Sequence, residues 1–291
     1  MKKLLIVIAF FICWIILAQS CMKMRISDSE AKKQFAAAGV TLHTETLDVN
    51  GFKLHYVQTG NDTFPTLFFV HGSPGSWDAF SVYLKDSDLL KKYRMVSIDR
   101  PGFGYSEFGN ARNLSDQSAI ISPIFKHIQN GKPIYIIGHS LGGPMIVKLV
   151  ADNPFTFSGM VILAGSVDPA EEAPEKWRGF LKNSGLQYLL PGAFRPSNNE
   201  IWYLKKDLPP LSKQFASITC NVWIIHGNKD KFVPVGNAAY AKKMLVNAKS
   251  VDVTILDGAP HFIPWAPWYI DVKKVLLQLH GTMSPNGMLP E

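Results

Sequence analysis

Ser140 lies in a sequence pattern that suits a nucleophile. The residues Gly138-His139-Ser140-Leu141-Gly142 directly follow an apolar run at 134–137. In a nucleophile elbow, a serine on a strained turn between a strand and a helix projects its Oγ above the sheet. Glycine fits two residues away on either side, because larger side chains would clash there. The pattern therefore predicts that Ser140 is a nucleophile.

Asp230 and His261 are the partners that such a serine needs. Asp230 lies just after an apolar run at 222–226, and His261 follows another run at 251–256. A serine hydroxyl is a weak nucleophile at neutral pH, so a histidine must take its proton, while an aspartate fixes the imidazole tautomer and stabilises the imidazolium. The order Ser140, Asp230, His261 along the chain is the one expected around an elbow of this kind.

Two backbone N–H groups are candidates for an oxyanion hole. The Leu141 N–H lies at the start of the helix expected after the elbow, where helix N–H groups favour negative charge. The second candidate is the Ser73 N–H in the segment His71-Gly72-Ser73-Pro74-Gly75, which follows the apolar run Thr66–Val70. Each donor of this kind contributes about 3 kcal/mol in the transition state.

The elements that must position these residues alternate between strands and helices. We expect strands at Thr66–Val70, Met95–Asp99, Ile134–Gly138, Met160–Leu163, Val222–His226 and Val251–Leu256, and helices at Trp77–Lys91, Ser115–Gln129, Leu141–Asp152, Val235–Leu245 and Trp265–His280. Unbroken apolar strands that alternate with helices predict an α/β fold, with a mainly parallel sheet covered by helices on both faces. Functional groups gather at the carboxyl ends of such strands.

The remaining segments predict how the chain is divided. A capping box at Ser27-Asp28-Ser29-Glu30 indicates a short helix up to Gly39, and Asn50-Gly51 indicates the type I′ turn of a hairpin. Residues 168–217 interrupt the alternation with many prolines and aromatic residues, which predicts a small helical cap inserted into the sheet domain. We therefore expect a tether at 21–45, a core at 46–167 and 218–281, and a C-terminal tail at 282–291.

Five motifs in this order resemble the α/β-hydrolase superfamily. They are the segment around His71, the run Asp99-Arg100-Pro101-Gly102-Phe103-Gly104-Tyr105-Ser106, the Ser140 elbow, and the loops that carry Asp230 and His261. The resemblance covers roughly residues 46–280 and implies serine acyl transfer, since the dehalogenases and epoxide hydrolases of the superfamily carry an aspartate at the elbow.

The resemblance leaves the acid open between two residues. Some members carry it after the strand at 160–163, where Asp168 stands, but the Gly-x-x-Asp context of Asp230 is similar to the commoner pattern and is preferred. The run 99–106 is expected to shape one wall of the site, with Phe103 in contact with substrate.

The expected activity is cleavage of a small-molecule carboxylic ester through an acyl-enzyme. An aminopeptidase or amidase, or a cofactor-free perhydrolase, are alternatives, as is a non-catalytic binding protein of the same fold. An amidase would need acids that hold the substrate amine, for which exposed acids of the cap are the candidates: Glu171, Glu172, Glu175 and Glu200.

Other partners are not expected. No set of His, Cys and carboxylate residues has metal-ligand spacing, so neither a metal nor a cofactor is predicted. The net charge of +7 is spread along the chain without a basic stripe interleaved with aromatics, which argues against nucleic acid. His226 is expected to pack beneath the Asp230 loop. Core or surface roles are assigned to His43, His55, His127, His139 and His280, because none of them has a carboxylate at a placement comparable to that of His261.

The N-terminus predicts export. Lys2 and Lys3 precede the apolar run Leu4–Leu17 and the small residues before Cys21, as in a signal peptide at 1–20. The segment also resembles a bacterial lipobox, with Cys21 acylated, although glutamine at position 19 departs from the usual pattern. We expect a membrane-anchored lipoprotein that faces the periplasm or exterior. Simple secretion and an uncleaved membrane anchor are the alternatives.

The three cysteines offer no disulfide framework for an exported protein. Cys13 lies inside the apolar run, Cys21 at the expected cleavage point, and Cys220 at the head of a predicted strand, where it is expected to be a buried core residue.

Overall fold

A single eight-stranded sheet organises the chain. The computed structural model describes residues 2–279, and its strands follow the order β1-β2-β4-β3-β5-β6-β7-β8 across the sheet. β1 and β2 form an antiparallel hairpin, β2 is antiparallel to β4, and the strands from β4 to β8 are parallel. The strands span His43–Val49 (β1), Phe52–Thr59 (β2), Thr66–Val70 (β3), Arg94–Ile98 (β4), Ile134–His139 (β5), Gly159–Leu163 (β6), Asn221–Gly227 (β7) and Ser250–Leu256 (β8).

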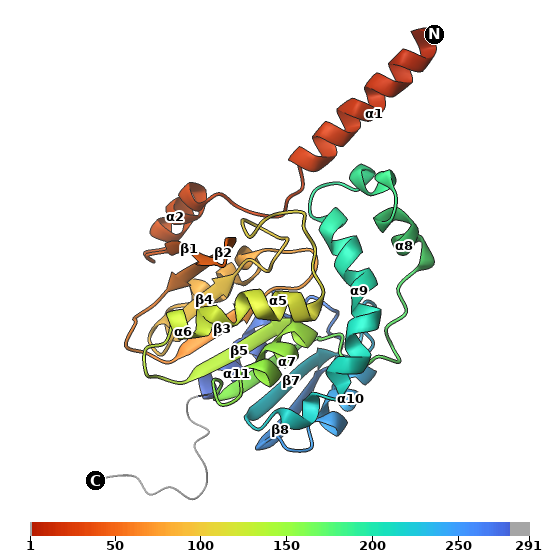
Figure 1. Cartoon of the computed structure of the whole chain (residues 1–291). Coiled ribbons are helices and arrows are strands. Elements are labelled where there is room, and N and C mark those ends of the chain that lie inside the picture. The colour runs from red at the N-terminus through yellow and green to blue at the C-terminus, as the bar shows by residue number, and fades with distance from the viewer. Residues whose placement is uncertain (1, 280–291) are drawn as a thin grey trace, which may run out of the picture.

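Helices cover both faces of the sheet. The central strands β3, β4, β5 and β6 are buried along their whole length, as expected for apolar strands between two helical layers. One core joins the sheet to α5, α6, α7, α9 and α10, and a second joins its other face to α2, α3, α4 and α11. Figure 1 shows α5, α6 and α7 in front of the sheet. The predicted fold class is therefore confirmed.

The helices outside the segment 168–217 are shorter than expected in three places. They span Asp28–Ala37 (α2), Ser81–Leu84 (α3), Ser87–Leu90 (α4), Leu114–Ile121 (α5), Pro123–His127 (α6), Gly142–Asp152 (α7), Gly236–Met244 (α10) and Tyr269–Gln278 (α11), with a 3-10 turn at Trp77–Phe80. The continuous helices expected at 77–91 and 115–129 are wrong.

Local chemistry explains where these helices break. Asp86 caps α4 by accepting hydrogen bonds from the N–H groups of Asp88 and Leu89, so it begins a new helix. Pro123 stands at the start of α6, where the missing proline N–H costs nothing. Pro267 likewise keeps the last helix from starting at Trp265, and the expected end of that helix at His280 lies outside the described residues.

The two short-range signals near the N-terminus are confirmed. The Ser27 hydroxyl accepts a hydrogen bond from the Glu30 N–H at 3.3 Å, which is one of the two bonds of a capping box, whereas the Glu30 carboxylate accepts from the Gln34 side chain. Gly39 follows α2 with φ of +71°. Asn50 and Gly51 both have positive φ, at 52° and 87°, which is the conformation of a type I′ turn.

The segment 168–217, called the cap segment from here on, contains four helical elements between β6 and β7. They are α8 (Lys176–Lys182), the 3-10 helix η2 (Gly185–Leu189), α9 (Phe194–Ser212) and the 3-10 helix η3 (Phe215–Ser217). α9 packs on the core through Leu204, Leu208 and Leu211, whereas no residue of η2 is buried. In Figure 1, helix α1 (Lys2–Ser20) projects away from the body with its C-terminal end beside this segment.

All three cysteines are free thiols. Cys220 corrects one expectation, because it is only partly buried, against the core that joins the sheet to α7 and α9. Burial raises the pKa of its thiol to about 11, so it carries little of the reactive thiolate at neutral pH.

A substitution at Gly138 would test the close packing of backbone atoms beneath the elbow. A Cβ at this position would overlap the Gly142 carbonyl, so Gly138→Ala should lower the free energy of unfolding by about 1–3 kcal/mol or more. Gly185→Ala is the matched control, since nothing lies within 4 Å of its added Cβ, and it should change stability by less than about 0.5 kcal/mol. Urea unfolding of both variants checks this, and equal stability of the two would contradict the steric argument.

Candidate active site

Ser140 occupies the strained turn that the elbow pattern predicts. It lies between the end of β5 and the start of α7, and its φ of +56° falls in the left-handed region that non-glycine residues rarely adopt. An added Cβ at Gly138 would overlap the Gly142 carbonyl, and one at Gly142 would overlap the Val70 carbonyl. Glycine at both positions is therefore a steric requirement of the turn.

His261 joins Ser140 to Asp230 through two hydrogen bonds. The His261 Nε2 lies 2.9 Å from the Ser140 Oγ, and its Nδ1 lies 2.7 Å from the Asp230 Oδ2. With the ring proton on Nδ1, the imidazole donates to the carboxylate and accepts from the serine hydroxyl. The structure thus brings together three predicted residues from the ends of β5, β7 and β8, in an arrangement suited to proton transfer during attack.

Asp230 is held as a carboxylate by its surroundings. Burial alone raises the pKa of Asp230, but hydrogen bonds from His226 and His261, and from the Val233 N–H, outweigh it, so the net pKa lies well below the ordinary range. His226 lies beneath this loop as predicted, with its Nε2 3.3 Å from Asp230 and 3.0 Å from the Val233 carbonyl. A permanently ionised acid is what the imidazolium of a charged intermediate needs.

Asp168 makes a different set of contacts. Its Oδ1 accepts a hydrogen bond from the Ala170 N–H at 2.8 Å, and its own N–H donates to the Asn237 side chain. These bonds belong to a turn after β6, and no bond joins Asp168 to His261 among residues 2–279. The geometry favours Asp230 as the partner of the histidine.

The two predicted oxyanion donors flank Ser140. Leu141 follows it directly and forms the N-cap of α7. A Cβ built on Gly72 would lie 3.0 Å from the Ser140 Cβ, so the peptide between Gly72 and Ser73 adjoins the nucleophile. The side chain of Ser73 points elsewhere and donates to the Ser197 hydroxyl at 2.8 Å. The oxyanion role of both N–H groups remains a prediction.

Arg100 ties this region to α9 through a buried ion pair. Its guanidinium donates to both Glu200 carboxylate oxygens, at 2.7 and 2.8 Å, and neither side chain is exposed by more than 1%. The same guanidinium donates to the carbonyls of His71 at 2.8 Å and Gly72 at 3.0 Å. Arg100 therefore fixes the backbone beside Ser140 and joins it to the cap segment.

Two expectations about residues in this region are wrong. Glu200 was expected to be an exposed acid available to a substrate amine, but its charge is buried and neutralised by Arg100. Phe103 was expected to contact substrate, but it is fully buried, with its ring against His71 and Arg100. Sequence offers no local signal for the pairing of residues a hundred positions apart.

Two further histidines are buried near the site. Burial and the neighbouring His261 lower the pKa of His139 to about 3, so it stays neutral beside the candidate base, with ring centres 4.8 Å apart. His71 also has its pKa held low, by burial and by the Arg100 charge, and accepts a hydrogen bond from the Arg100 N–H. Neutral rings here leave the proton chemistry to His261.

His55 is buried, in agreement with the core role expected for it, and it has two carboxylate partners. It lies 2.8 Å from Asp99, which follows β4, and 3.2 Å from Asp28 on α2, so it joins α2 on one side to the start of the run 99–106 on the other. Burial lowers the pKa of His55, but the hydrogen bond and charge of Asp99 outweigh this and raise it overall.

A cavity of about 900 Å³ opens above Ser140 and His261. Its apolar wall comes from the tether, the cap segment and the loops after β7 and β8: Met24, Ile26, Phe194, Ile201, Leu204, Phe232, Phe262 and Trp265. Charged residues also line it: Arg25, Asp78, Glu171, Glu172, Glu175, Arg178 and Lys231. Burial raises the pKa of Glu172, whose carboxylate accepts a hydrogen bond from Ser166. The contribution of the tether was not predicted.

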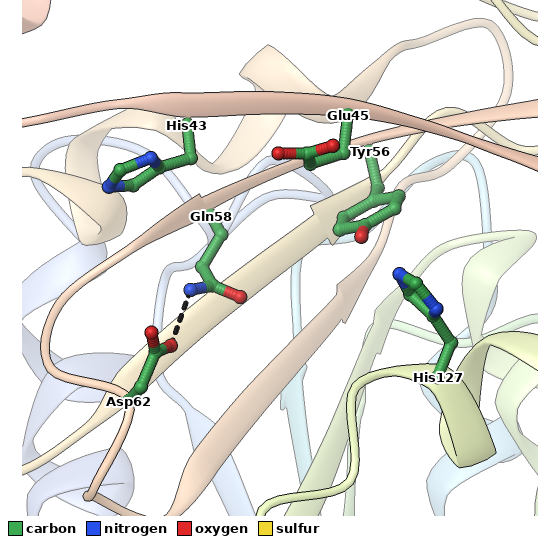
Figure 2. A pocket seen from close by; sticks show the side chains of 6 residues that line it. All are labelled: His43, Glu45, Tyr56, Gln58, Asp62 and His127. Atoms are coloured by element: carbon green, nitrogen blue, oxygen red, sulfur yellow. Dashed lines mark hydrogen bonds between the residues drawn. The ribbon is translucent and has the colours of Figure 1, made fainter.

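A second, polar hollow of about 310 Å³ lies at the antiparallel edge of the sheet (Figure 2). Its two histidines, His43 and His127, stand at opposite ends of the hollow, and Gln58 donates to Asp62 at 2.6 Å. Within the described part of the chain, no group of side chains is arranged to hold a metal ion. None of the described residues that line this hollow also lines the cavity above Ser140, so the hollow is not a candidate for the chemistry.

Comparison with known proteins agrees with this architecture. Residues 65–188 match the family model described as the alpha/beta hydrolase fold. "Epoxide hydrolase 1" of Caenorhabditis elegans is 32% identical over 105 residues, which are 35% of this chain and 25% of that protein. "Monoglyceride lipase" of Mus musculus is 30% identical over 107 residues, 34% of each chain. The chain thus spans only a quarter to a third of these relatives.

A solved structure extends the likeness over nearly the whole chain. A bacterial membrane phospholipase A superposes with a TM-score of 0.66 at 18% identity, covering 96% of both chains. At this level of identity the likeness concerns the fold alone.

The buried pair gives a stability prediction. Glu200→Gln leaves the Arg100 charge buried without its counterion, so it should lower the free energy of unfolding by roughly 3–5 kcal/mol. Glu175→Gln is the control, since Glu175 is more than half exposed and its pair with Arg178 should contribute less than about 1 kcal/mol. Denaturant unfolding of the two variants is the measurement, and a small effect of Glu200→Gln would contradict the role given to the pair.

Proposed function

We propose that this chain, which has the α/β-hydrolase fold, is a member of that superfamily and a serine hydrolase that cleaves a carboxylic ester. The observation that carries this proposal is the pair of hydrogen bonds that links Ser140 through His261 to Asp230 at the base of a large, mainly apolar cavity. A nucleophile, a base and a group that orients the base are the parts that acyl transfer requires.

The proposed reaction proceeds in two halves. His261 takes the Ser140 proton as Oγ bonds to the ester carbonyl carbon, and the N–H groups of Ser73 and Leu141 stabilise the oxyanion. The intermediate then breaks its bond to the alcohol oxygen, which leaves with the proton from His261. Water attacks the acyl-enzyme with His261 as base, and the acid departs as Ser140 recovers its proton. Asp230 stabilises the imidazolium in both halves.

Two observations favour an ester over other substrates of the fold. Ser140 stands where the epoxide hydrolases of the superfamily carry an aspartate, although one similar protein bears that name. The wall of the cavity is largely aliphatic and aromatic, which suits the acyl chain of an ester.

An amide substrate with a free amine is the second candidate. Glu171, Glu172 and Glu175 line the cavity and could face such an amine. Two features weaken this option: Glu200 is neutralised by Arg100, and burial raises the pKa of Glu172, so that its negative charge is less favoured.

Membrane attachment through the N-terminus is also part of the proposal. α1 is long and apolar enough to cross a bilayer by length and composition, and only 6% of its most apolar window is buried. Acylation of Cys21 after cleavage remains a prediction, as does retention of α1.

Substrate preference decides between the two candidates. We expect turnover of p-nitrophenyl esters of graded chain length, and little turnover of amino-acid p-nitroanilides. A fluorophosphonate should label the protein at Ser140 and leave Ser140→Ala unlabelled. Labelling without ester turnover but with anilide turnover would favour the amidase, and no labelling would favour a binding protein.

The triad predicts how single and double substitutions combine. Ser140→Ala and His261→Ala should each lower kcat on the order of a million-fold, and the double variant should be hardly worse, because residues that act as a unit are not additive. Multiplicative losses would argue against a shared step.

The acid is tested by the same ester assay. Asp230→Asn should lower kcat by roughly ten-thousand-fold, since the amide supports the wrong imidazole tautomer. Asp168→Asn, the matched control, should change kcat far less. The reverse result would assign the acid to Asp168.

A further inference from the structure

The C-terminal half of α1 makes specific contacts with the cap segment. The Trp14 indole donates to the Leu189 carbonyl at 3.1 Å. The Gln19 amide donates to the carbonyls of Tyr188 and Leu190, both at 2.9 Å, and accepts from the Arg195 guanidinium at 3.0 Å. Both the nitrogen and the oxygen of the Gln19 side-chain amide are therefore hydrogen-bonded to the cap segment. A segment that is removed after export has no need of such partners.

The backbone at the end of α1 and just after it also makes hydrogen bonds to the cap segment. The Gly192 N–H donates to the Ala18 carbonyl at 2.5 Å, and the Ala193 N–H donates to the Met22 carbonyl at 2.9 Å. Gly192 has a φ of +49°, and a Cβ there would overlap the Met22 carbonyl. Ala18 is 96% buried by these contacts. Cleavage before Cys21 would remove Trp14, Ala18 and Gln19, and with them most of the partners just described.

The length of α1 sets the level of the cap segment relative to a bilayer. Its 19 residues extend for about 28 Å, close to the thickness of the hydrocarbon core. Trp14 lies six residues before the end of the helix, or about 9 Å along its axis, and touches Leu189 there. If α1 crosses the membrane, η2 must enter the boundary between headgroups and acyl chains to a depth of up to about 9 Å, which is the depth that interfacial helices reach and a region where tryptophan is favoured.

The surface at that level is apolar and unusually exposed. We call residues 176–189, which form α8 and η2, the cap tip. Trp177, Phe180, Leu186 and Tyr188 on this tip are exposed by 47, 65, 43 and 45%. Two basic residues accompany them: Lys176 and Lys182. Aromatic and aliphatic side chains among basic residues suit the headgroup region of an anionic membrane.

We propose that α1 is retained as a transmembrane anchor and that the cap tip rests in the interface of the same bilayer. The occupant of the exposed apolar surface is therefore lipid. The tether runs directly from the anchor to the cavity, since Met24, Arg25 and Ile26 line its wall. The cavity consequently opens close to the membrane. This proposal concerns location and does not depend on the chemistry of Ser140.

Photocrosslinking of the full chain tests the contact between the cap tip and lipid. p-Benzoylphenylalanine replaces Phe180, and in a matched control replaces Phe155, which is 95% exposed on the loop between α7 and β6. The proteins are reconstituted in vesicles of phosphatidylethanolamine and phosphatidylglycerol that contain radiolabelled phospholipid. We expect at least a tenfold larger yield of lipid adduct at position 180. Equal yields, or no adduct at position 180, would overturn the contact.

Intact mass tests the retention of α1. The protein purified from bacterial membranes should have the mass of the full 32.4 kDa chain, with or without its first methionine. A chain that begins at an acylated Cys21, or at any later residue, would overturn retention. Neither measurement uses turnover, so their failure is distinct from a failure of the proposed hydrolase activity, which the fluorophosphonate and ester assays address.

Discussion

The site depends on backbone segments that approach one another more closely than side chains allow. Gly138 faces the carbonyl of Gly142, Gly142 faces that of Val70, and Gly143 meets Gly165 across the start of α7. These contacts press the helix against the ends of β3, β5 and β6 and leave Ser140 in its left-handed turn. The packing of the hydrophobic cores on both faces of the sheet offsets the conformational strain of the Ser140 backbone. The other groups of the site converge on a position that this packing has already fixed.

Arg100 extends this rigidity outward. One guanidinium holds the carbonyls of His71 and Gly72 on the inner side and the Glu200 carboxylate on the outer side. The loop next to Ser140 and the first half of α9 are therefore held by the same side chain. A buried pair of this kind contributes more to a unique arrangement than to net stability, because desolvation of both charges offsets much of their attraction. Displacement of α9 would be transmitted to the backbone beside Ser140.

Local patterns allowed much of this arrangement to be predicted. Apolar runs located the parallel strands, and because their carboxyl ends meet at one edge, the loops of Ser140, Asp230 and His261 could be expected to converge. Patterns failed where contacts join distant segments. Nothing near Glu200 indicates its partner Arg100, nothing near His55 indicates both Asp28 and Asp99, and the breaks at Asp86 and Pro123 interrupt runs whose apolar periodicity continues.

The tether has a practical consequence for anyone who prepares this protein in soluble form. Deleting the chain up to the capping box of α2 is an obvious way to avoid detergent, yet it would also delete Met24, Arg25 and Ile26 from the wall of the cavity. The guanidinium of Arg25 lies 4.1 Å from the centre of the Tyr105 ring and bonds to the Gly104 carbonyl, so its loss would also uncover the loop beside the site. A truncated protein of this kind would have a wider entrance to the cavity, and any substrate preference measured on it would reflect the deletion rather than the native protein.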